Sequence, residues 1–191
     1  PRVPARAMSS APELLTVGHG QLDREGLSTL LRNASVQTLV DIRRYPGSRH
    51  NVDVSSDEMA EWLPAAGIDY RWDVRLGGRR KLPPGPSPDT WWTVESFRAY
   101  AAHTRSSEFA EGLTDLFASI DGGRTAVMCS EAVWWRCHRR LVADVVQIGY
   151  EIPVRHLMHD GKVRDHRPAD GARRVGDGQL VWDGGPVDRN S

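Results

Sequence analysis

The chain has 191 residues, and its 25 Lys and Arg residues balance its 25 Asp and Glu residues, so the formal net charge is zero. This balance excludes strong attraction to nucleic acid or to a membrane surface through net charge, although local basic patches remain compatible with it. The length fits one domain, which can fold without a disulfide or a metal. Two cysteines are too few for a disulfide-built secreted scaffold. We find no signal peptide and no apolar run of membrane-spanning length, and we expect a cytoplasmic protein with no membrane partner.

Residues 1–12, which are rich in Pro, Ala, Arg and Ser, are expected to form a loose leader. The apolar run LLTV predicts a first strand at 14–17, and Asp23 can cap the helix that follows. Ser55 or Ser56 can cap a later helix, and Gly149 is a candidate left-handed cap. The remaining elements expected from periodicity are a strand at 38–42, a helix at 57–67, a strand at 68–73, a helical stretch at 94–119, a strand at 125–129, a helix at 136–149 and a last strand at 152–157.

Strands that alternate with helices predict an α/β fold. We expect a single three-layer αβα domain over residues 13–166, with a mostly parallel central sheet. A long Gly- and Pro-rich loop at 77–91 interrupts this rhythm, and loops of that length are usually functional or mobile. Residues 167–191 are expected to form a polar C-terminal extension, in which 178–185 make either a short hairpin or a tail that packs on the domain.

Polar residues gather where the predicted strands end. In a parallel sheet the carboxyl ends of the strands meet at one edge, and sites form there. We therefore expect one pocket built from four strand ends. The residues concerned are His19 after the first strand, Asp41, Arg43 and Arg49 at the second, Gly77, Gly78 and Arg79 after the third, and Cys129 and Glu131 at the end of the 125–129 strand.

The segment CSEAVWWRCHRR (129–140) carries the densest chemistry. A strand, a loop and a helix N-terminus in this order favour anion binding, because free N–H groups and the helix dipole point at the ligand. Glu131 is the candidate general acid or base, Cys129 a candidate nucleophile and His138 a candidate proton relay. The alternatives stay open that Cys129 is a small core residue and that Glu131 only pairs with an arginine.

A second group of residues is expected to bind the ligand. Arginines suit bidentate contacts with phosphate or carboxylate, glycines permit close backbone approach, and a tryptophan can stack on a flat ring or simply fill the core. Cys137 is equally well explained as an inert helix residue. These candidate ligand-binding residues are His19, Arg43, Arg49, Gly77, Gly78, Arg79, Trp134, Cys137 and Arg139.

Asp41 at a strand end is a candidate acid or base, and the alternative is a salt bridge with an arginine that fixes the loop. Metal binding is not expected, because neither Cys129 with Cys137 and His138 nor the later histidines match a trusted zinc spacing. No cofactor is required by the sequence, and none is identified.

Several motifs taken together resemble a known family. The segments TVGHG, LVDIRRYPGSRH, LGGRR, MCSEAVWWRCHRRLVAD and HLMHDGKVRDH resemble the domain-of-unknown-function family 488, from about Thr16 to His166. The sequence departs from the family at Gly20, where serine is frequent. The resemblance implies an α/β domain with the polar pocket described above, and it implies no particular reaction.

Three functions compete. The first is an enzyme that acts on a nucleotide, nucleoside or nucleic-acid base through an arginine-rich anion pocket, with Glu131 and Asp41 as acid/base candidates. The second is cysteine-dependent sulfur or phosphoryl transfer, as in rhodanese-like or cysteine-phosphatase sites; a glutamate beside the thiol argues against it, because it raises the pKa of the thiol. The third is a non-catalytic module that binds a nucleotide or nucleic acid. The expected partner is a small anionic or nucleotide-like ligand, with nucleic acid as a further possibility.

Overall fold

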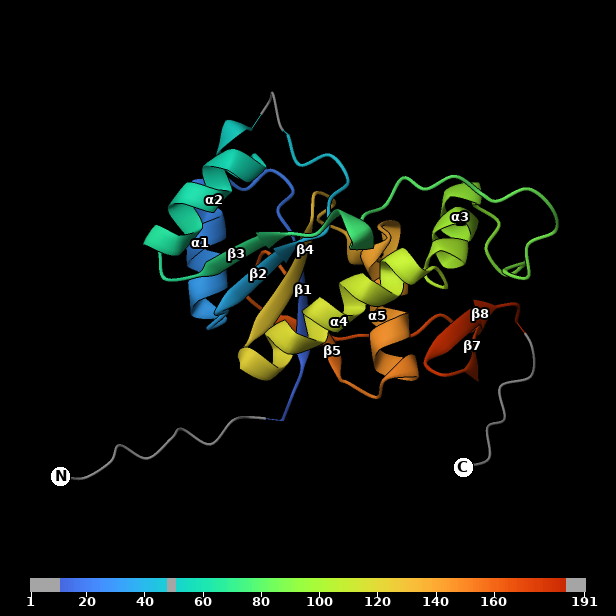
Figure 1. Ribbon diagram of the computed structural model, residues 1–191. Helices are drawn as coiled ribbons and strands as arrows, with labels where there is room; N and C mark the ends of the chain where they lie inside the picture. Colours follow the sequence, from blue (N-terminus) through green and yellow to red (C-terminus); the bar gives the residue numbers. More distant parts are fainter. Residues whose placement is uncertain (1–10, 48–50, 185–191) are drawn as a thin grey trace.

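Six strands form a central sheet in the order β3-β2-β4-β1-β5-β6 in the computed structural model, which describes residues 11–47 and 51–184 (Figure 1). The first five strands of this sheet pair in parallel, and β6 runs antiparallel to β5 at one edge. The α/β fold with a mostly parallel sheet is thereby confirmed. The strands are β1 (Leu14–Gly18), β2 (Thr38–Asp41), β3 (Asp69–Trp72), β4 (Thr125–Cys129), β5 (Val154–Leu157) and β6 (Val163–Asp165).

The two central strands, β1 and β4, are buried along their whole length. Their continuous apolar sequences fit a sheet that is covered on both faces. The register pairs Gly18 with Cys129, and the backbone N–H of His19 donates to the Cys129 carbonyl at 3.0 Å. The carboxyl ends of β1 and β4 are therefore held side by side, which brings residues more than a hundred positions apart into one site.

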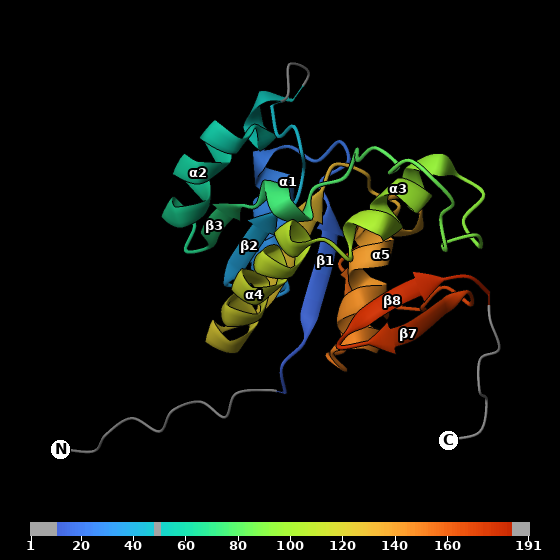
Figure 2. The same cartoon turned by 45° about the vertical axis from the view of Figure 1, so that its right-hand side comes forward.

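Helices cover both faces of the sheet, as Figures 1 and 2 show. One face packs on α1 (Arg24–Asn33) and α2 (Ser56–Ala65) through a core that includes Leu27 and Trp62. The opposite face packs on α3 (Glu95–His103), α4 (Ser107–Gly122) and α5 (Arg139–Asp144). Asp23 caps α1 as expected, because its side chain accepts a hydrogen bond from the Gly26 N–H at 2.8 Å.

Two helices differ from the sequence-based expectation. The stretch 94–119 is not one helix, because Ser106 accepts a hydrogen bond from the Phe109 N–H and starts α4 as a separate element. The helix expected at 136–149 begins three residues later and ends in a π-helical turn, Val145–Gly149. Gly149 is no left-handed cap: a Cβ there would lie 2.4 Å from the Gly178 carbonyl oxygen, so glycine allows close packing.

The strand at 152–157 is not the last one, because β6 follows it and a hairpin follows β6. The hairpin pairs β7 (Ala172–Gly176) with β8 (Gln179–Trp182), so it begins before the segment 178–185 in which a hairpin or a packed tail was expected, and that segment supplies its second strand. Figure 2 shows it beside α5. Trp182 is fully buried there, and its indole N–H donates to Asp144 at 2.8 Å. Within the described part of the chain, no helix combines the length and apolar character needed to cross a membrane.

Candidate functional site

A pocket of about 290 Å³ opens at the carboxyl ends of β1, β2 and β4. This is the edge at which ligands bind in open parallel sheets. Most of its walls come from loops that follow strands, and its positive groups come from the loops after β2 and β3. The described residues that line it are His19, Arg43, Arg44, Tyr45, Gly47, Gly78, Arg79, Cys129, Ser130 and His138.

One wall is fixed by an ion pair between Asp41 and Arg43. The Asp41 carboxylate is fully buried and accepts hydrogen bonds from the Arg43 backbone N–H, from the Arg43 guanidinium and from the Tyr70 hydroxyl at 2.9 Å. Burial, together with the carboxylate, raises the pKa of Tyr70, which stays protonated and donates. Because its oxygens are so fully engaged, Asp41 is positioned to orient Arg43 and does not line the pocket.

His19 is held as a neutral imidazole against Arg43. The guanidinium Nη1 lies 3.2 Å from His19 Nε2, and an arginine can only donate, so Nε2 accepts. The proton then sits on Nδ1, which donates to the Gly20 carbonyl at 3.0 Å. Burial, and then the charge of Arg43, lowers the pKa of His19 from 6.5 to about 4. His19 therefore contributes no positive charge to the pocket near neutral pH.

Two thiols lie around one imidazole beside the pocket, which Cys129 and His138 line. His138 Nδ1 lies 3.5 Å from Cys137 Sγ and 3.8 Å from Cys129 Sγ. His138 Nε2 lies 3.1 Å from the Ile42 carbonyl oxygen, which can only accept. The proton of a neutral His138 is thus on Nε2, and the lone pair of Nδ1 faces both sulfur atoms.

The two thiols differ in their acidity. A hydrogen bond from the Cys129 thiol, followed by the charge of Arg139, lowers the pKa of Cys137 to about 6 against the opposing effect of burial. The same hydrogen bond, together with burial, raises the pKa of Cys129 to about 12. Both thiols are almost fully buried, at 7% exposed for Cys129 and 6% for Cys137, and of the two only Cys129 lines the pocket. The more acidic thiol is therefore the one further from an incoming substrate.

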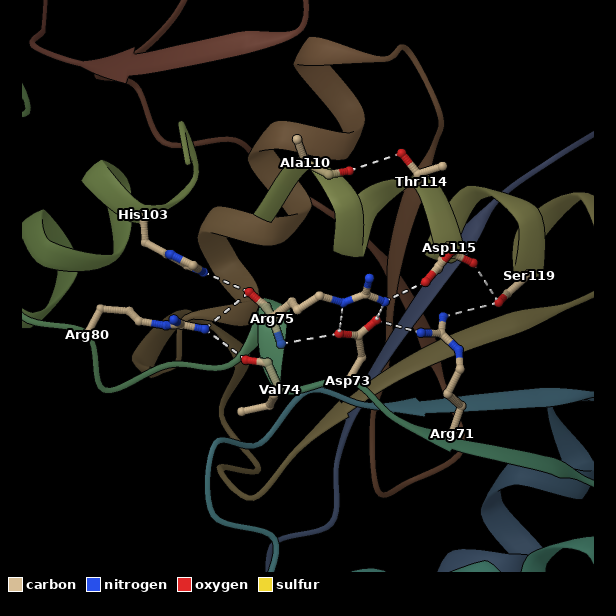
Figure 3. Close-up of polar contacts among 10 residues, drawn as sticks. All are labelled: Arg71, Asp73, Val74, Arg75, Arg80, His103, Ala110, Thr114, Asp115 and Ser119. Atoms are coloured by element: carbon tan, nitrogen blue, oxygen red, sulfur yellow. Dashed lines mark hydrogen bonds and ion pairs between the residues drawn. The ribbon is translucent and has the colours of Figure 1, made fainter. Parts of the chain in front are cut away.

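The loop after β3 is fixed by a second aspartate. Asp73 accepts hydrogen bonds from the guanidinium groups of Arg71 and Arg75 and from the Arg75 N–H (Figure 3). The Arg75 carbonyl faces His103 Nε2 at 2.7 Å. Arg80 donates to the Val74 carbonyl at 2.8 Å and also to the Gly77 carbonyl. Arg80 therefore stabilises this loop, and the residues that precede it are the ones that line the pocket.

Gly78 and Arg79 are the residues that this loop presents to the pocket. A Cβ at Gly78 would lie 2.8 Å from His138 Nδ1, so glycine permits the backbone to pack against the imidazole. Arg79 has a φ of 54° and lies over the Tyr45 ring at 5.7 Å. A non-glycine residue in this conformation carries strain of about 1–3 kcal/mol, and such residues cluster at functional sites.

Besides Asp41 and Cys137, four described candidates from the sequence do not line the pocket. The Glu131 carboxylate accepts the Val133 N–H at 3.1 Å. Arg139 is 1% exposed and donates to the Glu131 carbonyl. Trp134 stacks on His156 at 3.9 Å with an interplanar angle of 9°. Gly77 approaches the Arg44 backbone, so that a Cβ there would lie 3.2 Å from it. Arg49 lies outside the described residues, and its expected role is not addressed by the structure.

The segment from the cap of α1 into α5 matches a known family. Residues 23–146 match the family described as Domain of unknown function DUF488. The chain belongs to the DUF488 family. The matched segment of this DUF488 protein contains the loops after β2, β3 and β4, whereas His19 and the β7–β8 hairpin lie outside it. Comparison with curated proteins and with solved structures gives no match.

Sequence reasoning missed some of the pocket lining in this DUF488 chain. Arg44, Tyr45, Gly47 and Ser130 line the pocket and were not among the candidates. Their position in the sequence could have identified them, because each belongs to a loop that already contained candidate residues. Tyr45 is 65% exposed next to two arginines, and an exposed aromatic ring in a polar loop is the kind of residue that points to binding.

Proposed function

We propose that this DUF488 chain is an enzyme that binds a small anionic, nucleotide-like substrate in the pocket and acts on it. The observation that carries the proposal is the charge of the lining. Arg43, Arg44 and Arg79 line the pocket, and the described lining includes no carboxylate. A chain with zero net charge thus concentrates positive charge at one concave point, which favours an anion.

The size and the rim of the pocket support a small ligand with a flat ring. Ligand pockets range from about 300 to 1,000 Å³, so a volume of about 290 Å³ lies at the small end. The exposed ring of Tyr45 stands at the rim with Arg44 and Arg79 close to it. Stacking of a base on an aromatic ring contributes about 1–3 kcal/mol, so Tyr45 takes over the stacking role first expected for Trp134.

Cys129 and His138 line the pocket together with the arginines, and we expect the proposed reaction to depend on both of them. Glu131 and Asp41 were the acid/base candidates of the sequence, and their contacts favour supporting roles instead. Glu131 holds the loop between β4 and α5, and Asp41 orients Arg43. We therefore expect Glu131→Gln to fold and to retain turnover. Loss of turnover in a folded variant would indicate that Glu131 takes part in catalysis.

Cysteine-dependent sulfur or phosphoryl transfer is the second candidate. The lowered pKa of Cys137 favours it, since the thiolate is the nucleophile in such chemistry. However, Cys137 does not line the pocket, and the hydrogen bond to Cys137, together with burial, raises the pKa of Cys129, the thiol that does line it. A purely binding role is distinguished from both enzymatic candidates by the absence of any product.

Ligand binding tests the proposal directly. Isothermal titration calorimetry with inorganic phosphate and with nucleoside monophosphates should detect binding to the wild-type chain. A charge-assisted hydrogen bond contributes about 1.5–3 kcal/mol, so Arg79→Ala should weaken binding roughly 10- to 100-fold. The matched control is Arg164→Ala, which removes an exposed arginine of β6 away from the pocket.

Turnover is then followed by mass spectrometry of nucleotides, nucleosides and bases incubated with the chain. A product that the wild-type chain forms, and that Cys129→Ser and His138→Gln do not form, would support the proposal of an enzyme. Equal affinity in wild type, Arg79→Ala and Arg164→Ala, or no affinity for any of these anions, would refute the anion pocket. Binding without any product would leave the binding module as the better account.

A further inference from the structure

We infer that Cys129, Cys137 and His138 form a tetrahedral zinc site whose fourth position opens into the pocket. The three ligand atoms, two Sγ and one Nδ1, all lie within 4.8 Å of one another. Among the described residues this is the cluster of histidine, cysteine and acidic side chains that is arranged to hold an ion. The linear spacing of these residues did not indicate zinc, because the 129–137 loop brings the two sulfur atoms to the same imidazole.

The two nitrogen–sulfur distances fit edges of a zinc tetrahedron. Zn–S bonds of about 2.3 Å and Zn–N bonds of about 2.0–2.1 Å place sulfur and nitrogen ligands about 3.6 Å apart in tetrahedral geometry. The observed distances from His138 Nδ1 are 3.5 Å to Cys137 and 3.8 Å to Cys129. Two thiolates and one imidazole are soft and borderline ligands that suit zinc and disfavour magnesium or calcium.

The imidazole is already oriented for coordination. Its Nε2–H donates to the Ile42 carbonyl oxygen at 3.1 Å, which leaves the Nδ1 lone pair directed at the two sulfur atoms. Histidine ligands of metals are typically fixed by such a hydrogen bond from the other ring nitrogen. Gly78 packs against the ring, and the centroid of the Tyr100 ring lies 4.9 Å from that of the imidazole, so both residues restrict its position.

The fourth position faces the proposed substrate. Cys129 and His138 line the pocket and Cys137 does not, so an ion held between the three atoms borders the pocket on one side. Structural zinc sites have four protein ligands, and catalytic ones have three and a water molecule. Zinc with an open position polarises a bound oxygen or activates a water molecule. The metal site depends on the three ligands alone, while its catalytic use rests on the proposed function.

Metal content of the reduced full-length chain tests the inference. Both cysteines are free, so a disulfide between them is the competing state, and reduction under argon removes it. Mass spectrometry of the metal should give about one zinc per chain. Cobalt in place of zinc should give thiolate-to-metal charge-transfer absorption and the intense visible bands of a tetrahedral site.

Ligand variants supply the comparison. Cys129→Ser, Cys137→Ser and His138→Gln should each weaken zinc binding by more than the roughly 10- to 100-fold that loss of a second-shell partner costs. Arg164→Ala is the control, since it alters an exposed residue of β6 that does not line the pocket, and it should keep the cobalt spectrum. Circular dichroism of each variant without metal shows whether it is folded.

A reduced, folded wild-type chain that takes up neither zinc nor cobalt would overturn the site. Folded ligand variants that bind as tightly as wild type would do so as well. The anion titrations separate this inference from the proposed function. Zinc binding without anion binding keeps the site and refutes the function, whereas anion binding without zinc does the reverse.

Discussion

His156 is expected to make the chain less stable in acid. Burial, then the neighbouring His166 and Arg139, lowers the pKa of His156 from 6.5 to about 3. The folded chain therefore keeps this imidazole neutral at pH values where the unfolded chain protonates it. Its contribution to stability is full above pH 6.5 and is lost as the pH falls toward 3. With these pKa values, the loss between pH 7 and pH 5 is on the order of 2 kcal/mol.

The contacts of His156 explain why it stays neutral. Its Nδ1 lies 2.7 Å from the Thr16 hydroxyl, its Nε2 lies 3.0 Å from His166 Nδ1, and His166 in turn contacts Asp144 at 2.7 Å. A proton on Nδ1 would break the first contact, and the ring is 1% exposed under Trp134. A charge placed on this buried ring would lose most of its hydration, so protonation is disfavoured.

Urea denaturation at pH 7 and pH 5 measures the effect. His156→Gln keeps an N–H donor toward His166 and cannot titrate, so wild type should lose about 2 kcal/mol more than the variant over this interval. His19 and His103, whose pKa values are also lowered, remain in both chains, so the difference isolates His156. Wild type and His156→Gln losing the same free energy between pH 7 and pH 5 would refute the reasoning.

Three further outcomes follow from the packing. Asp41→Asn leaves a buried guanidinium without its counter-charge and should lower the free energy of unfolding, measured by urea denaturation, by about 3–5 kcal/mol. Tyr70→Phe should lower it by about 1 kcal/mol, and equal losses would contradict the ion pair as the main contact that holds this wall. Gly18→Ala puts a Cβ 1.9 Å from a carbonyl oxygen and should lower Tm sharply, whereas Gly122→Ala, with nothing within 4 Å, should not; equal Tm values would be evidence against the close contact. Trp182→Ala should cost about 3–5 kcal/mol, and a cost near zero would mean that the hairpin is peripheral.

Much of the fold could be predicted from the sequence because the signals were local. Runs such as TAVMC are continuous and apolar, and this pattern is typical of a parallel strand covered on both faces. The boundaries that failed depended on competing local signals. Ser106 caps a helix inside an otherwise helical stretch, and its propensity to start a helix outweighed the periodicity around it. The close approach of Gly149 to Gly178 is a long-range contact that no local pattern shows.

The site could be predicted as a location but not as a set of side-chain directions. The carboxyl ends of the strands identified the loops, and His19, Arg43, Gly78, Arg79, Cys129 and His138 do line one pocket. Glu131 and Trp134 follow Cys129 in the loop after β4, but they do not line the pocket. Which way a loop residue points depends on contacts with distant partners, such as the stacking of Trp134 on His156, and these contacts are set only by the fold.

The chain has no net charge, yet the pocket lining is positive, because the aspartates nearby are buried behind the lining. Asp41 and Asp73, both buried, accept hydrogen bonds from arginines of their own loops and lie behind the lining. Those arginines are thereby fixed, and the negative charge is kept away from the ligand. Arg79 forms no ion pair with any residue that the structure describes, and it occupies a strained conformation in the pocket lining. Because its cost is not explained by packing, Arg79 is the residue for which ligand binding offers the clearest physical reason, and it is the first position at which the anion pocket should be tested.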